Sequence, residues 1–115
     1  MDRSAKLLGH LERNRELLRI FREKRIDLEK ARSIDIRFWS SDQSSAVRLA
    51  SELYKRGYTL LLLGPARVRD KSDLWNIEAS TLVSISRAAS EDFASMLTDL
   101  AAEFGAEFDG WGTSV

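Results

Sequence analysis

The sequence contains no cysteine, a single histidine and a single proline, and its longest apolar run is Leu60 to Leu63. Without cysteine, the chain cannot form a disulfide framework or a thiolate metal site. The apolar run is far shorter than the roughly 20 residues that a membrane-spanning helix needs. Residues 1–11 contain no apolar core segment, so we also expect no secretory signal.

An excess of charge of either sign is also absent, because 18 Lys and Arg balance 18 Asp and Glu. The two charges are unevenly distributed: residues 1–32 carry ten bases against six acids, and residues 33–115 carry eight against twelve. Neither part is charged strongly enough to bind nucleic acid or a membrane by itself. A chain of 115 residues has the size of one domain with one core.

Few residues could carry chemistry. His10 lies in a helical segment among Arg and Glu, where we expect a surface histidine without a positioned catalytic partner. Only an all-oxygen metal site is open to this composition, and the C-terminal acids are spaced along a helix instead of gathered in a loop. Gly110 and Gly112 are followed by no helix, so they do not form a phosphate-binding loop. We therefore expect no catalytic residue, no metal and no cofactor.

Apolar periodicity predicts the secondary structure. The first 25 residues are predicted to form a helix, with Asn14 on or beside its apolar seam. Gly9 weakens that helix, so we expect its first turns to fray or to form a separate arm. The apolar side chains predicted to face inward are Leu7, Leu8, Leu11, Leu17, Leu18 and Phe21.

The remaining elements alternate between strands and helices. Residues 33–39 are predicted to form a half-buried strand, and Ser40 or Ser41 to cap a helix whose apolar side includes Val47 and Tyr54. The continuous run in residues 58–63 predicts a strand covered on both faces, and therefore a central one. Five further elements are predicted after it: a charged loop over 67–73, a strand over 75–83, a loop over 86–90, a helix over 90–104 and a short closing strand over 106–108.

The predicted order is a helix followed by β-α-β-β-α-β. That order predicts an α+β, ferredoxin-like sandwich, with an irregular α+β sandwich of the same elements as the alternative. We expect one domain over residues 1–115, made of an N-terminal helical extension (1–28) and a core (33–113).

Two segments resemble a known family. One is the helix end Leu100-Ala101-Ala102-Glu103-Phe104-Gly105 followed by Glu107-Phe108-Asp109-Gly110-Trp111-Gly112-Thr113, and the other covers residues 34–58, from Ile36-Arg37-Phe38-Trp39 to Lys55-Arg56-Gly57-Tyr58. Both are similar to the RraB-like domain, named for the regulator of ribonuclease activity B, an inhibitor of ribonuclease E.

The resemblance implies a bacterial, cytoplasmic binding protein without an active site, which contacts an enzyme of the ribonuclease E type and changes its action on RNA. The best-known members of the family are strongly acidic and carry an acidic tail after the Trp-Gly motif, whereas this sequence is neutral and ends at Val115.

Aromatic and charged residues on short segments mark the predicted partner surface: Arg37, Trp39, Asp109, Trp111 and Thr113. Trp and Arg dominate the binding energy of many interfaces, although we expect Trp111 to be partly structural. Direct RNA binding is not expected, because the strand over 75–83 lacks the basic and aromatic pattern of RNA-binding sheets. The rival prediction is a module that binds a small molecule or self-associates through its sheet or N-terminal helix.

Overall fold

Four antiparallel strands form one sheet in the order β2-β3-β1-β4. The structure is a computed structural model, and it describes residues 3–66 and 74–115. Its elements are α1 (Arg3–Glu23), β1 (Ala31–Ser40), α2 (Gln43–Lys55), β2 (Thr59–Pro65), β3 (Trp75–Ser84), α3 (Ile85–Ala88), α4 (Glu91–Glu103) and β4 (Glu107–Thr113). The protein is therefore α+β, as the sequence predicts.

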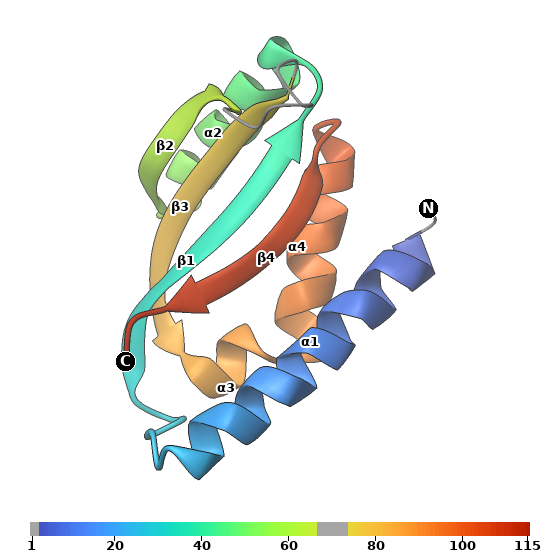
Figure 1. Ribbon diagram of the computed structural model, residues 1–115. Helices are drawn as coiled ribbons and strands as arrows, with labels where there is room; N and C mark the ends of the chain where they lie inside the picture. Colours follow the sequence, from blue (N-terminus) through green and yellow to red (C-terminus); the bar gives the residue numbers. More distant parts are fainter. Residues whose placement is uncertain (1–2, 67–73) are drawn as a thin grey trace.

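The sheet has one covered face and one open face. Along β1, Ile34, Ile36 and Phe38 are buried, whereas the intervening Asp35 and Arg37 are exposed. This alternation follows from the two-residue period of a strand. In Figure 1, α2 and α4 lie behind the sheet, and the open face is turned toward the reader. The hydrophobic core lies between those helices and the sheet.

The two long helices behind the sheet begin and end at residues suited to those positions. The Asp42 carboxylate accepts hydrogen bonds from the backbone N–H groups of Ser44 and Ser45, so Asp42 caps α2 in place of the predicted serines. Ser90 caps α4. Gly57 and Gly105 follow the two helices with φ of 91° and 71°, the left-handed conformation that glycine adopts without steric cost.

The N-terminal helix is continuous and packed, which corrects the prediction of frayed first turns. Its first residue, Arg3, pairs with Asp99 of α4, and Lys6 Nζ lies 2.7 Å from the Glu107 carboxylate of β4. Tertiary contacts therefore offset the low helix propensity of Gly9. Leu8 was predicted to face inward but is exposed.

Strand β2 is an edge strand, so its predicted central position is wrong. It pairs with β3 alone, and Leu60, Leu61, Leu62 and Leu63 are all exposed. Two inward predictions on α2 are also wrong, because Val47 and Tyr54 are exposed beside this strand.

Two further differences concern loops and the C-terminal segment. The segment predicted as a loop over 86–90 begins with the last residues of the short helix α3. The closing strand is longer than predicted, because it runs through Gly110 and Gly112 to Thr113 instead of ending before a turn. The charged loop predicted over 67–73 lies outside the described residues.

No helix in the described part of the chain is long and apolar enough to span a membrane.

Candidate functional site

Arg37 lies at the centre of the open face. In the sheet register its Cα partners are Glu78 on β3 and Gly110 on β4. Gly112 of β4 presents no side chain there, and a Cβ added at this residue would lie 3.9 Å from a guanidinium nitrogen of Arg37. Gly112 therefore leaves this side of the arginine accessible.

A β-bulge places Asp109 beside Arg37. The register of β1 and β4 shifts between Arg37 and Phe38, so that Phe108 pairs with Phe38, Gly110 pairs with Arg37, and Asp109 is the extra residue. A hollow of about 240 Å³ results, lined by Arg37, Phe38, Asn76, Glu78 and Asp109. It combines one cation with two carboxylates, which suits a polar, charged partner surface.

Trp39 lies two residues after Arg37 on β1, outside the lining of the hollow. Its Cα partners are Asn76 on β3 and Glu107 on β4, and the tryptophan is only partly buried. A partly exposed tryptophan next to an arginine on the same face is a typical centre of binding energy in an interface. Strand alternation accounts for this placement, because Trp39 lies two residues after the exposed Arg37.

Trp111 points the other way. Only 2% of its surface is exposed, and it packs in the core, 6.4 Å from the ring of Phe21. Its indole N–H donates to the side-chain oxygen of Asn14 at 2.8 Å, and the Asn14 amide donates to the carbonyl of Ala89 at 3.3 Å. A partner that binds the open face cannot contact this ring, so the role of Trp111 is structural.

Thr113 lies further along the sheet, opposite Ile34, and its hydroxyl donates to the Ser33 carbonyl at 2.9 Å. Of the five residues predicted for the surface, the structure thus brings together Arg37, Trp39 and Asp109. It adds Asn76 and Glu78, which alternate along β3 with the buried Ile77. Their proximity to Arg37 depends on strand order and register, which the pattern alone does not give.

The comparison with protein families supplies the remaining finding. The family described as regulator of ribonuclease activity B, RraB, matches residues 11–113, nearly the whole chain. The protein belongs to the RraB family. Among curated proteins, none matches this sequence. The family is one of ribonuclease regulators, and both segments on which the resemblance was based lie inside the matched range.

The histidine of this RraB-family chain belongs to the packing between α1 and β4, and not to the open face. The ring of His10 lies 4.7 Å from that of Phe108, and burial lowers the pKa of the imidazole. The histidine was predicted at the surface, but it is half-buried. Its hydrogen-bonding partner is the backbone of Phe108 instead of a nucleophile.

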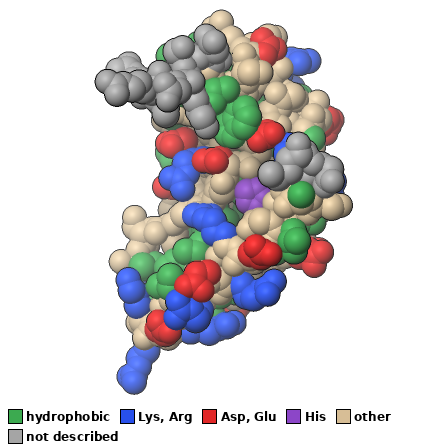
Figure 2. Space-filling view, turned by 45° about the vertical axis from the view of Figure 1, so that its right-hand side comes forward, with side chains coloured by type: hydrophobic (Ala, Val, Ile, Leu, Met, Phe, Trp, Pro, Cys, Tyr) green, Lys and Arg blue, Asp and Glu red, His purple; other side chains and the backbone are tan. Residues whose placement is uncertain are grey.

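Charges of both signs are mixed over the α1 side of the molecule. Figure 2 shows acidic and basic side chains interspersed on this view, with basic ones more frequent toward its lower end. Within the described residues, no group of three or more His, Asp or Glu side chains could hold a metal ion. The arrangement of charged and aromatic side chains on the open face is suited to binding.

Proposed function

We propose that this RraB-family protein binds a ribonuclease of the E type through the open face of its sheet and slows RNA cleavage without catalysing a reaction itself. The observation that carries the proposal is the hollow of the open face that Arg37 and Asp109 line, with Trp39 two residues after Arg37 on the same strand. Membership of a family of ribonuclease regulators supports the class of partner. The proposal includes a bacterial, cytoplasmic location, which the resemblance to regulators of ribonuclease activity B implies.

The proposal includes the fold type. Strands β1 and β3 occupy the centre of the sheet, and helical connections join β1 to β2 and β3 to β4. This order supports a ferredoxin-like core over residues 33–113, extended by the helix in residues 1–28 and forming one domain with it. Such a core leaves one sheet face free for a partner, because both crossover helices cover the other.

Calorimetric titration of the protein into the ribonuclease from the same source, followed by cleavage assays on one RNA, tests the function. We expect Trp39→Ala to weaken binding by at least about 30-fold, since a central interface tryptophan contributes roughly 2 kcal/mol or more. Arg37→Ala should weaken binding and relieve the slowed cleavage in the same way.

The matched control is Leu82→Ala. Leu82 is exposed on β3, four residues along the strand from Glu78 and therefore about 13 Å from the near side of the hollow. It should bind as the unmodified protein does. Circular dichroism must show all three variants folded. Normal binding by folded Trp39→Ala and Arg37→Ala would remove the open face as the binding surface, and absence of binding by the unmodified protein would remove the ribonuclease as partner.

A further inference from the structure

The outer edge of the sheet is apolar on both of its sides. Along β2, Leu60 and Leu63 pair with Ala79 and Ile77, whose side chains face the core, so these leucines lie on the side of α2. A bulge inserts Leu61 before Leu62, which pairs with Glu78 of the open face. The exposed fractions of the four leucines range from 37% to 51%. Residues with such side chains normally lie inside a protein.

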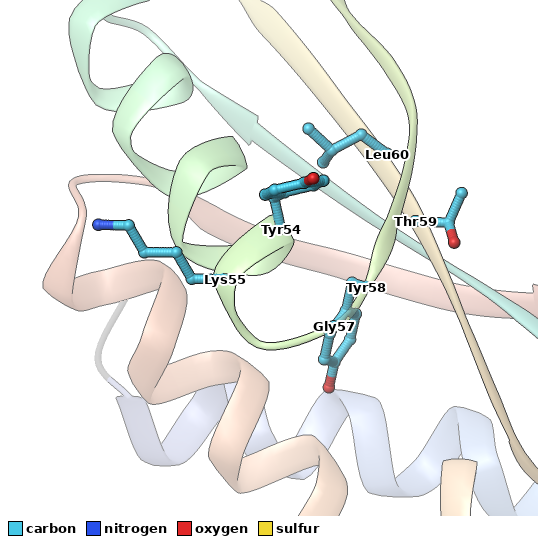
Figure 3. Close-up of a pocket in the computed structure, with 6 residues that line it drawn as sticks. All are labelled: Tyr54, Lys55, Gly57, Tyr58, Thr59 and Leu60. Atoms are coloured by element: carbon cyan, nitrogen blue, oxygen red, sulfur yellow. The ribbon is translucent and has the colours of Figure 1, made fainter.

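The apolar surface continues onto α2. A groove of about 420 Å³ lies between this helix and β2, and its apolar lining includes Val47, Ala50, Tyr54, Leu60 and Leu63. Tyr54 is 71% exposed. Figure 3 shows its ring extending from the last turn of α2 toward Leu60, beside a second hollow at the start of β2. Of nine large hydrophobic side chains exposed in the described residues, six lie on this α2–β2 surface.

The opposite edge of the sheet differs because the chain covers it. Arg13 of α1 donates to the carbonyl of Trp111 on β4 at 3.0 Å, and His10 hydrogen-bonds the backbone of Phe108. Gly110 makes this approach possible, since a Cβ there would lie 2.9 Å from an Arg13 nitrogen. One edge is thus protected by α1, whereas the described residues place no such cover over β2. Uncovered edge strands are templates for pairing with another chain.

We propose that the α2–β2 surface is the interface between two copies of this chain, joined by antiparallel pairing of β2 with β2. The strand covers residues 59–65, so full overlap about a two-fold axis places Leu62 opposite Leu62. Two leucine-rich edges then bury each other. The only charged residue that lines the groove is Lys55, and apolar character of this kind is typical of homodimer interfaces.

Charge also fits a second copy. The two-fold axis makes the α2 helices antiparallel, so the end that carries Lys55 in one subunit approaches the end that carries Asp42 in the other. Asp42 is exposed, and hydrogen bonds from the Ser45 hydroxyl and backbone keep its pKa below the usual range, so it is negative at neutral pH. The two sheets then form one eight-stranded sheet. Its open face carries the Arg37, Trp39 and Asp109 surface of each copy.

Molecular mass in solution tests the proposal. Light scattering or sedimentation equilibrium should give twice the chain mass of 13.1 kDa at micromolar concentration. Leu62→Lys should give the monomer mass, because two like charges would lie directly opposite each other and the apolar contact between the leucines would be lost. Leu82→Lys, on an exposed leucine outside the surface, should remain dimeric. A monomeric unmodified protein, or a dimer that survives Leu62→Lys, would overturn the proposal.

Cross-linking tests the register independently of stability. Because the chain has no cysteine, Leu62→Cys and Thr59→Cys each introduce a single thiol. Mild oxidation should join the Leu62→Cys copies, whereas two copies of residue 59 lie about 20 Å apart in this register and should stay unlinked. Equal cross-linking of both variants would exclude the paired strands. Ribonuclease binding is then measured with the Leu62→Lys variant. If the variant is monomeric and still binds the ribonuclease, the proposed function does not depend on the dimer, so the two proposals can fail separately.

Discussion

At the scale of single residues, the contact between Asn14 and Trp111 shows how the N-terminal helix is held to the sheet. The two residues are 97 positions apart, and both are buried. Asn14 accepts from the indole N–H and donates to the Ala89 carbonyl, so both functional groups of its amide have partners. A buried polar group is tolerated only when it is satisfied in this way. The pair therefore fixes where α1 lies against β4.

Replacing Asn14 should be costly for that reason. We expect Asn14→Ala to lower the free energy of unfolding by about 1–3 kcal/mol, because the indole N–H and the Ala89 carbonyl lose their partner. In a Trp111→Phe background the indole N–H is already absent, so the same substitution should cost roughly 1 kcal/mol less. Urea unfolding of the four proteins measures this coupling. An equal cost in both backgrounds would mean that the hydrogen bond contributes nothing to stability.

The residue scale also shows where a sequence pattern is insufficient. Trp39 and Trp111 both lie in aromatic segments, yet one is on the open face and the other in the core. Alternation placed Trp39 correctly because β1 is regular from residue 34 to residue 38. It could not place Trp111, since the bulge at Asp109 changes which residues of β4 share a face. A bulge depends on the neighbouring strand, which the local sequence does not identify.

At the scale of elements, two glycines in or beside helices should respond in opposite ways to the same substitution. Gly9 lies within α1, and an added Cβ would meet nothing within 4 Å. We expect Gly9→Ala to raise the free energy of unfolding by about 0.5–1 kcal/mol through helix propensity. The Gly57 site is equally spacious, but its φ is 91°. Gly57→Ala should therefore destabilise the protein by about 1–2 kcal/mol through backbone strain alone.

Urea unfolding of these two variants measures the effect of backbone conformation alone, because both sites have room for the added Cβ. A stabilising Gly57→Ala would show that the turn after α2 adopts another conformation in solution. A destabilising Gly9→Ala would mean that α1 bends or contacts another segment at this residue.

Strand β2 shows what an element's sequence leaves undecided. Four consecutive leucines predict a strand covered on both faces, and that physical preference remains valid. The predicted central position was wrong because the pattern indicates only that the leucines prefer to be buried. It does not indicate whether the same chain or another chain buries them. Helix ends depend on local residues by contrast, because Ser90 caps α4 with its own hydroxyl, and Gly57 and Gly105 end α2 and α4 through their own backbone.

At the scale of the whole molecule, stability should depend on pH in two separate ranges. Burial lowers the pKa of His10 below its ordinary value of 6.5. As pH falls through that value, the unfolded chain binds a proton that the folded chain does not, so the free energy of unfolding decreases. Asp42, with its pKa held below 3.8 by hydrogen bonds from Ser45, stabilises the fold above that pH, and its contribution is lost as pH falls further.

Urea unfolding between pH 8 and pH 3 should separate the two groups. His10→Gln, which stays neutral, should show a smaller loss of stability than the unmodified protein below about pH 6.5. Asp42→Asn, which preserves an N-cap, should change the loss only near pH 4 and below. An unchanged pH profile for His10→Gln would mean that the contact of α1 with β4 leaves the imidazole hydrated, and that α1 is held to the sheet by Asn14 and Arg13 instead.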